Sequence, residues 1–338
     1  MKVKLLTFSN TPNYGALLQT YALSEILYSF GYQVELLKVL LYKPSLKNTL
    51  RRYLYDRFML HFQKYYLPCY TKIENVDPGA IYIVGSDQVW NPHFIPLCRL
   101  LFFLDFLPTG IKKISYAASF GEQEFRCSDE DKKQIKMLLR DFSAISVRES
   151  SAVELCQNEF GVTPEHVLDP TLLLNDYSNI SGTLTMQNDL VSFKFIQSSD
   201  YYQVLSFVAK RLNLKITRLD HRYIKIGEKE YISKHVSVNT WVKTIAESSF
   251  FITDSFHGVA LALIHGKQFI VLPSVISRMG RVISLLRLLG IENRYYESVD
   301  EVYKRLDWME LIDYGKVFEK LNREREYSLS FLRNSLSK

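Results

Sequence analysis

The first forty residues alternate between apolar and amphipathic stretches in a way that predicts strand, helix and strand. Residues 3–8 are mostly apolar, as expected of a strand buried in a parallel sheet. Residues 9–13 have the composition of a turn, and a helix is expected from Tyr14 to Phe30, ended by Gly31. A second strand at residues 34–39 completes a βαβ unit.

The same alternation continues along the chain. Further strands are expected at residues 81–84, 114–118, 144–147, 166–168, 190–196, 215–219, 250–253 and 268–272, and helices at 129–140, 150–160, 201–212, 239–247, 258–265, 281–289 and 316–332. A polar, irregular stretch at residues 176–189 interrupts the pattern once. Strands separated by helices predict parallel sheets covered on both faces. We therefore predict an α/β fold of two Rossmann-like, doubly wound domains facing a cleft, residues 1–175 and 176–338, with a C-terminal helix on the second.

One segment, residues 45–66, has apolar residues at helical spacing and a basic remainder. The apolar positions are Leu46, Leu50, Leu54, Phe58 and Phe62, and the cations are Lys47, Arg51, Arg52, Arg57 and Lys64. A solvated basic face is the simpler interpretation. The alternative is peripheral contact with an anionic membrane surface or with a diphosphate-linked acceptor.

Composition narrows the class of protein. The chain has 338 residues, 47% of them hydrophobic and 23% charged, which suits two globular domains. A net charge of +6 fits an anionic ligand and is too small to indicate nucleic acid. Four scattered cysteines without a CxxC pair argue against a metal or redox site. With no signal peptide and no membrane-spanning run, we expect a cytoplasmic protein.

Polar residues follow four expected strands of the first domain, where ligands of such sheets bind. After the first strand, Asn13, Tyr14 and Gly15 open a helix whose N-terminus favours an anion, although a plain capping turn explains them equally well. After residues 81–84 come Ser86, Asp87, Gln88, Trp90 and Asn91; Asp87 could act as a base and the others could hold a sugar, unless Trp90 belongs to the core.

The next two strand ends add three candidates. Tyr116 and Ser119 carry hydroxyl groups among small residues that leave room for a ligand or for close helix packing. Arg148 follows residues 144–147 and could clamp a phosphate or carboxylate, with a structural salt bridge as the alternative.

The strongest candidate segment lies in the second domain, where an apolar strand ends in Thr253, Asp254 and Ser255. His257 and Gly258 then open an apolar helix, so the histidine is placed to move a proton near neutral pH beside an anion-binding helix N-terminus. A satisfied, half-buried histidine is the alternative. Arg278 and Arg281 follow, either directed at a ligand or solvated.

Seven segments, in order, resemble the polysaccharide pyruvyl transferase family. They are TPNYGALLQTYAL, IVGSDQVWNP, FFLDF, KKISYAASFG, AISVRES, VLDPTLLL and ITDSFHGVALALIHGKQFI. The resemblance implies a fold like that of the GT-B glycosyltransferases, phosphoenolpyruvate (PEP) as donor, a pyruvate ketal on a bacterial surface polysaccharide or its lipid-linked precursor as product, and no metal or organic cofactor.

The resemblance also assigns roles. His257 matches the histidine near the reacting PEP. Asp87, the candidate base after residues 81–84, is the second expected catalytic group. Arg148 matches an arginine that meets the donor. Ser255 stands where many members have an arginine, so either Arg278 or Arg281 supplies that contact or the contact is lost. We assign donor binding to Asn13, Gly15, Arg148, Ser255, Gly258, Arg278 and Arg281, chiefly on the C-terminal domain, and acceptor binding to Tyr14, Ser86, Gln88, Trp90, Asn91, Tyr116 and Ser119 on the N-terminal domain.

Two rival functions fit the same sequence. A GT-B nucleotide-sugar glycosyltransferase would share the fold, and a non-catalytic carbohydrate-binding homologue would explain Ser255. Binding of a nucleotide sugar in place of PEP, or of glycan alone, would distinguish them.

Overall fold

The computed structural model describes residues 1–39, 57–121, 124–219, 222–226, 229–233 and 236–337, and these residues divide into two compact units. The first unit gathers the described residues of Met1–Lys43, Gln63–Leu174 and Leu321–Lys338, and the second gathers those of Pro44–Phe62 and Asn175–Lys320. The chain therefore passes from one unit to the other one residue before the boundary predicted at 175/176.

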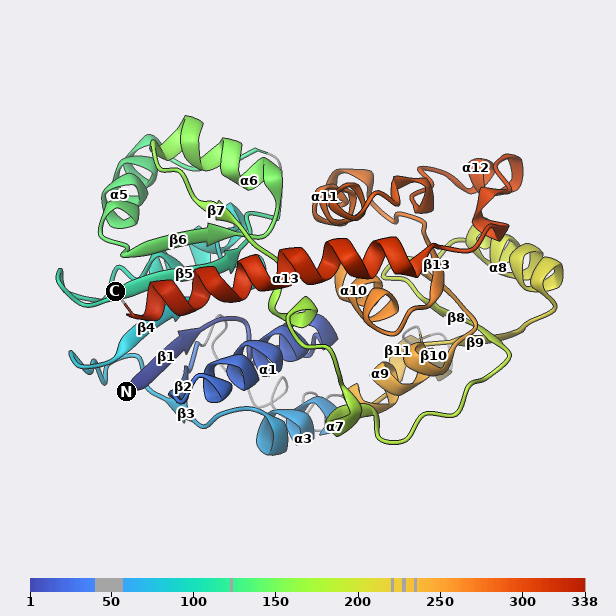
Figure 1. Ribbon diagram of the computed structural model, residues 1–338, viewed down its shortest axis with the longest axis horizontal. Coiled ribbons are helices and arrows are strands. Elements are labelled where there is room, and N and C mark those ends of the chain that lie inside the picture. Colours follow the sequence, from blue (N-terminus) through green and yellow to red (C-terminus); the bar gives the residue numbers. More distant parts are fainter. Residues whose placement is uncertain (40–56, 122–123, 220–221, 227–228, 234–235, 338) are drawn as a thin grey trace. The chain divides into compact units, whose positions relative to one another are not determined.

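The first unit is organised by a seven-stranded sheet in the order β3-β2-β1-β4-β5-β6-β7 (Figure 1). The strands are β1 (Lys2–Leu6), β2 (Gln33–Leu37), β3 (Tyr70–Thr71), β4 (Ile81–Val84), β5 (Lys113–Ala118), β6 (Ala144–Val147) and β7 (Glu165–His166), and every neighbouring pair is parallel. The chain winds outward from β1 in both directions, so the sheet is doubly wound and its switch point lies between β1 and β4. Ligands of open α/β sheets bind beyond the carboxyl ends of the strands at that point.

Helices connect these strands, and their ends follow local capping chemistry. Helix α1 (Tyr14–Ser29) starts where Asn13 Oδ1 accepts the N–H of Ala16, and the chain leaves it through Gly31 at φ 84°. Helix α5 (Asp129–Arg140) has the Ser128 cap and three acidic residues in its first turn, which suit the helix dipole. The other helical segments are η1 (Pro92–Phe94), α4 (Ile95–Cys98), η2 (Leu101–Phe103), α6 (Ser150–Leu155), η3 (Cys156–Phe160) and η4 (Pro170–Leu172). In α3 (Arg57–Tyr66), the residues from Gln63 onward group with this unit and those up to Phe62 with the second.

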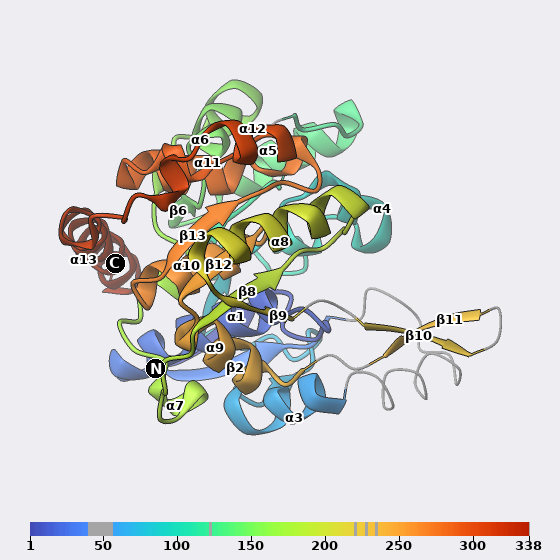
Figure 2. The same cartoon turned by 90° about the vertical axis from the view of Figure 1, so that its right-hand side faces the viewer.

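The second unit contains a four-stranded parallel sheet in the order β13-β12-β8-β9 (Figure 2). The strands are β8 (Asp189–Phe193), β9 (Lys215–Arg218), β12 (Phe250–Thr253) and β13 (Gln268–Val271), and the helical segments are α7 (Ser178–Ser181), α8 (Ser199–Leu212), α9 (Val238–Glu247), α10 (Phe256–Ile264), η5 (Ile276–Arg278), α11 (Gly280–Leu289), η6 (Glu292–Arg294), α12 (Val299–Lys304) and η7 (Asp307–Met309). Winding starts at β8, so β8 and β12 flank the switch point of this sheet. Both sheets confirm the predicted α/β class.

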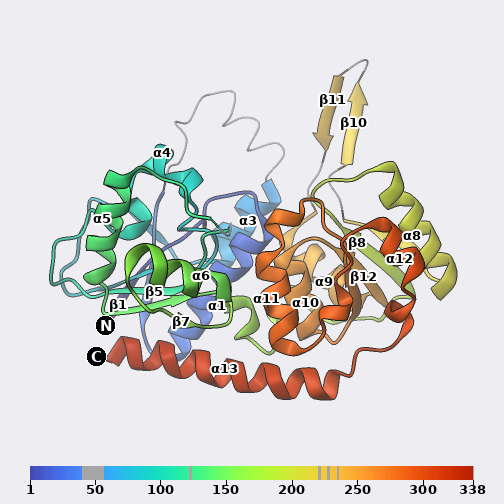
Figure 3. The same ribbon diagram turned by 90° about the horizontal axis from the view of Figure 1, so that it is seen from above.

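Two features of this second half were not predicted as the structure has them. Strands β10 (Arg222–Ile226) and β11 (Lys229–Ser233) form an antiparallel pair of their own (Figure 3). The last helix, α13 (Tyr314–Ser337), was assigned to the second domain, yet Leu321–Lys338 groups with the first unit.

Contacts explain the placement of the C-terminal residues. Arg325 Nε donates to the carbonyl of Leu172 at 2.8 Å, and Ser328 Oγ accepts the N–H of Leu168 at 2.9 Å. Leu332 is fully buried in the same helix. An amphipathic pattern predicts that a helix buries one face, but not which core receives it.

The basic segment predicted at residues 45–66 lies partly outside the described residues. Its described part, α3, begins at Arg57 and confirms helix there. Among the described residues, no helix is both long enough and apolar enough to cross a bilayer.

Candidate functional site

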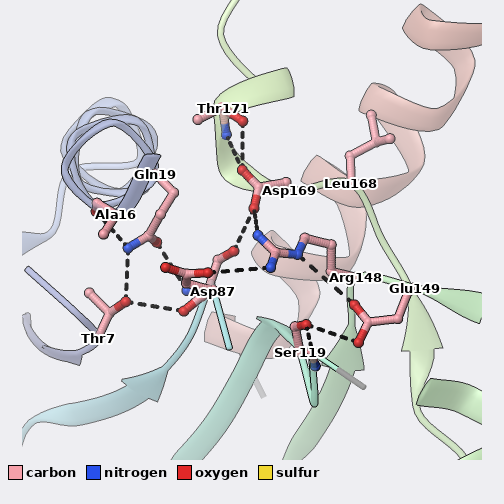
Figure 4. A network of polar contacts seen from close by, with 12 residues as sticks. Thr7, Ala16, Gln19, Asp87, Ser119, Arg148, Glu149, Leu168, Asp169 and Thr171 are labelled. Carbon is pink, nitrogen blue, oxygen red and sulfur yellow. Dashed lines mark hydrogen bonds and ion pairs between the residues drawn. The ribbon is translucent and has the colours of Figure 1, made fainter. Parts of the chain in front are cut away.

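Polar side chains from four strand ends of the first sheet meet in one buried network (Figure 4). At its centre is Arg148, directly after β6, with a side chain that is only 1% exposed. Its Nη1 lies 2.6 Å from Asp169 Oδ2, its Nη2 lies 3.4 Å from Asp87 Oδ1, and its Nε lies 4.0 Å from Glu149 Oε2. Burial alone would lower the pKa of Arg148, but the three carboxylates together raise it above its ordinary value, so the guanidinium stays charged.

Asp169 anchors one side of this network. Its Oδ2 accepts the Ser86 hydroxyl at 2.7 Å, and its Oδ1 accepts both the N–H and the hydroxyl of Thr171, at 3.0 and 2.6 Å. The same carboxylate caps the short helix η4. Asp169 is therefore tied to β4, β6 and the segment after β7 at once.

Helix α1 holds the other side through Gln19. The side-chain oxygen of Gln19 accepts the N–H of Ser86 at 3.2 Å, and its Nε2 donates to Thr7 Oγ1 at 2.9 Å. Thr7 in turn donates to the carbonyl of Ser86 at 3.1 Å. Ser86, predicted as an acceptor-binding residue, is fully buried and serves to fix the loop after β4.

Asp87 is the member of this network placed best for chemistry. It lies at the switch point, its side chain is 13% exposed, and Arg148 holds its Oδ1. Its backbone adopts φ 70°, a left-handed conformation, and its carbonyl accepts the N–H of Ser119 at 3.0 Å. The carboxylate is thus oriented on one side by a cation and retains access to solvent, as a general base requires.

Trp90 and Tyr116, both predicted to bind the acceptor, lie in the core. Trp90 is 1% exposed, stacks on Phe103 with ring centroids 5.5 Å apart, and donates its indole N–H to the carbonyl of Phe102 at 3.0 Å. Tyr116 is fully buried and donates to the carbonyl of Leu168 at 3.2 Å, and burial raises the pKa of its hydroxyl. Such burial argues against direct sugar contact for either residue.

The remaining acceptor candidates surround the loop after β4. Asn91 donates its side-chain amide to Gln88 Oε1 at 2.9 Å, and Gln88 is half-buried. Ser119 is buried and donates to Glu149 Oε1 at 2.9 Å. Tyr14 is 5% exposed in the first turn of α1. Of these, Gln88 keeps the most exposed side chain.

The donor candidates of the first unit have local structural roles. Asn13 is the exposed N-cap of α1, and Gly15 is buried within the helix. Arg148 faces carboxylates rather than solvent, which favours a positioning role over the predicted direct contact with the donor.

In the second unit, His257 lies in the first turn of α10, directly beyond the carboxyl end of β12. It is 7% exposed, and its ring meets that of Phe256 edge to face at 5.3 Å. Ser255 is the N-cap of α10, accepting the N–H of Gly258 at 3.2 Å. Gly258 packs closely, since an added Cβ would lie 3.0 Å from Thr253 Oγ1 and 3.1 Å from the Phe251 ring.

Arg278 and Arg281 follow β13. Arg278 is exposed at the end of η5, and Arg281 is half-buried in the first turn of α11. Within the described part of the chain, no group of three or more His, Cys, Asp or Glu side chains could hold a metal ion.

Glu149 was anticipated as a salt-bridge partner of Arg148, whereas Thr7, Gln19 and Asp169 were not predicted as members of the network. Asp169 had a usable signal, since an aspartate before Pro170 follows a short strand in a segment already noted as similar to the family. Gln19 had none, because a polar residue inside a helix is ordinary.

Comparison with solved structures identifies the fold. The chain is similar to the UDP-GlcNAc 2-epimerase from Neisseria meningitidis bound to UDP-GlcNAc, with a TM-score of 0.56 and 9% identity over 99% of each chain. It is also similar to UDP-N-acetylglucosamine 2-epimerase from Rickettsia bellii, with a TM-score of 0.52 and 12% identity over 100% of this chain and 96% of the other. These likenesses show the GT-B-like fold predicted from the sequence.

The family follows from sequence. The profile described as Polysaccharide pyruvyl transferase matches residues 13–274. The chain therefore belongs to the polysaccharide pyruvyl transferase family. A search of curated proteins finds no match.

Proposed function

We propose that this chain transfers the pyruvyl group of PEP to hydroxyls of a saccharide, forming a pyruvate ketal and releasing phosphate. The acceptor would be a bacterial surface polysaccharide or its lipid-linked precursor. The observation that carries the proposal is the Asp87 carboxylate, held 3.4 Å from Arg148 at the switch point of the first sheet in a chain of this family. A base at that position is what attack by a sugar hydroxyl requires.

The reaction begins with protonation of the PEP methylene carbon, for which His257 is the proposed acid. The adjacent carbon then becomes electron-poor and is attacked by the first sugar hydroxyl, whose proton passes to Asp87. The bond to phosphate breaks, and the second hydroxyl closes the ketal. The two hydroxyls lose two protons in all; one replaces the proton given to the methylene and the other leaves on phosphate.

Arg148 supports this reaction indirectly in the proposal. Its Nη2 lies 3.4 Å from Asp87 Oδ1 and keeps that carboxylate oriented. Arg278 and Arg281 are the proposed contacts for the donor's anionic groups, in place of the arginine that Ser255 replaces. Asn13, Gly15 and Gln88 remain candidate contacts at the first strand ends.

We further propose a cytoplasmic reaction at the inner face of the plasma membrane, without metal or cofactor. The basic segment at residues 45–66 supports contact with that surface. The cysteines Cys69, Cys98, Cys127 and Cys156 are all free, as is usual in a reducing compartment.

The test is calorimetric binding of PEP and UDP-GlcNAc to the full chain, followed by incubation with PEP and a panel of bacterial saccharides. We expect PEP to bind, UDP-GlcNAc not to bind, and one saccharide to trigger phosphate release with a new ketal methyl signal in its NMR spectrum. UDP-GlcNAc binding without PEP binding would instead support sugar transfer, the alternative suggested by the ligand of the similar Neisseria epimerase. Binding of glycan alone would favour the non-catalytic homologue.

A further inference from the structure

The ends of β8 and β12 place two charged residues side by side in the second unit. Thr253 pairs with Phe193 in the parallel register, so the next residues, Asp254 and Lys194, are neighbours on the same face of the sheet. Phe193 points to the opposite face, where it packs on Trp241 at 5.3 Å. Lys194 and Asp254 therefore lie on the face of the sheet that α8 covers, directly beyond the switch point between β8 and β12.

Both side chains are almost fully buried. Lys194 is 6% exposed and Asp254 is 3% exposed. A buried charge is costly unless other groups compensate for the lost hydration. Burial lowers the pKa of Lys194 against the opposing effect of Asp254, and burial raises the pKa of Asp254.

Both carboxylate oxygens of Asp254 accept hydrogen bonds from neighbouring loops. Its Oδ1 accepts the N–H of Phe195 at 3.1 Å, and its Oδ2 accepts the hydroxyl of Ser274. Ser274 also accepts the N–H of Ile196 at 3.2 Å. Asp254 thus fastens the loop after β8 to the loop after β13, which carries Arg278.

Lys194 also lies near an aromatic ring and the N-terminal ends of two helices. Its Nζ lies 4.8 Å from the ring centre of Tyr201, in the first turn of α8, and α10 begins two residues after Asp254. Both helices direct their N-terminal ends to this edge of the sheet, and helix N-termini attract anions. Asp200, the acidic residue of the first turn of α8, is exposed.

We infer that Lys194 binds an anionic group of the donor, a phosphate or a carboxylate, and that Asp254 is the residue that positions it. The inference deepens the proposed function and rests on it for the identity of the donor as PEP. Lys194 adds to Arg278 and Arg281 a donor contact that the sequence did not indicate. A lysine ammonium is a compact point charge, suited to phosphate in this setting.

The test compares the full wild-type chain with Lys194→Met, Lys194→Arg and the control Lys210→Met, an exposed lysine of α8. Calorimetry with PEP and with inorganic phosphate gives the affinities, and the melting temperature without ligand reports folding. We expect Lys194→Met to weaken both ligands at least tenfold, Lys194→Arg to retain part of the affinity, and Lys210→Met to bind as wild type. Equal affinities in Lys194→Met and wild type would overturn the inference.

A second measurement uses only wild-type protein and so does not depend on variants that fold. Reductive methylation followed by mass spectrometry reports the reactivity of Lys194 with and without saturating phosphate. Protection of Lys194 but not of Lys210 supports the site, and unchanged reactivity of Lys194 opposes it.

The outcomes separate this inference from the proposed function. If phosphate binds in a way that depends on Lys194 but PEP does not bind, the result supports the anion site at Lys194 and contradicts pyruvyl transfer from PEP. If the Lys194 substitutions change neither PEP affinity nor turnover, the result supports pyruvyl transfer and excludes Lys194 as a donor contact. Wild-type protein that binds neither PEP nor phosphate would count against both.

Asp254→Asn tests the positioning role. If Asp254 holds Lys194 charged, the variant should release the ammonium proton at lower pH, so PEP affinity should begin to fall at a lower pH than in wild type. A purely structural role would lower the melting temperature and leave that pH profile unmoved.

Discussion

Arg148 Nη1 lies 2.6 Å from Asp169 Oδ2, and neither side chain has more than 1% of its surface exposed. The carboxylate is fixed in turn by Ser86 and Thr171. Asp169 therefore fixes the guanidinium at Nη1. The Nη2 of the same guanidinium then holds Asp87, the candidate base, in place. The sequence predicted Arg148 either to clamp a ligand or to form a structural salt bridge, and the structure shows this cation surrounded by carboxylates.

Replacing Asp169 with Asn should destabilise the first unit. The buried guanidinium would lose its nearest counter-charge, which costs about 3–5 kcal/mol when a buried pair is broken. We expect about 3 kcal/mol, the lower end, because Asp87 and Glu149 still face Arg148. Denaturant unfolding followed by circular dichroism measures the change, with the exposed Glu154→Gln as control, expected within about 0.5 kcal/mol of wild type. An Asp169→Asn protein as stable as the control would contradict the anchoring role.

Replacing Asp87 with Asn should remove activity without unfolding the protein. Asn tolerates the left-handed backbone at φ 70° as well as Asp does, so the loop after β4 keeps its conformation. Loss of a general base lowers turnover by about 10²–10⁴-fold. Phosphate release from PEP in the presence of acceptor measures the rate, and PEP affinity should stay near wild type. The exposed Asp105→Asn is the matched control, and wild-type turnover in Asp87→Asn would exclude this base.

Replacing His257 with Gln tests the acid. Gln is neutral and close in size, so α10 should keep its first turn, while turnover falls by about 10²–10⁴-fold. His265→Gln, after the other end of the same helix, is the matched control and should retain turnover. Wild-type phosphate release by His257→Gln, with PEP still bound, would assign the proton transfer to another group.

Much of the fold follows from local pattern. The bounds of β4, β6 and α5 were predicted to the residue, because apolar runs and a capped amphipathic helix are signals contained within a few residues. The meeting of Asp87 and Arg148 could also be anticipated, since carboxyl ends of parallel strands share one edge of a sheet. The β10–β11 pair was overlooked although its two alternating runs are only two residues apart in the sequence, a spacing typical of a hairpin.

The contacts across the network could not be read from the chain. Ser86 and Asp169 are 83 positions apart, and no local rule relates them. Trp90 shows the same limit, because an aromatic residue between polar neighbours fits a sugar platform and a core position equally well. Trp90 stacks on Phe103, which lies in η2, a segment where the sequence pattern predicts neither helix nor strand.

Replacing Trp90 with Ala should therefore act on stability rather than on acceptor choice. Deleting a buried Trp costs about 3–5 kcal/mol, and Trp90→Phe should cost less because a ring remains to stack on Phe103. Denaturant unfolding of both variants gives the free energies. A Trp90→Ala protein that unfolds like wild type but loses glycan binding would restore the acceptor role.

His265 should make the second unit less stable as pH falls. Burial, with a contribution from Lys267, lowers the pKa of His265 from 6.5 to about 4, while Asp176 opposes the shift. Below pH 6.5 His265 takes up a proton in the unfolded chain but not yet in the folded chain. The contribution of neutral His265 to the unfolding free energy is therefore fully present above pH 6.5 and is lost as pH falls from 6.5 towards 4. The upper limit is about 3 kcal/mol. The unfolding free energies of wild type and His265→Gln are measured from pH 7 to 4. Because Gln does not titrate, their difference gives the pH-dependent contribution of His265. The wild type should lose stability more steeply than the variant, and parallel curves would show that His265 binds its proton equally well in both states.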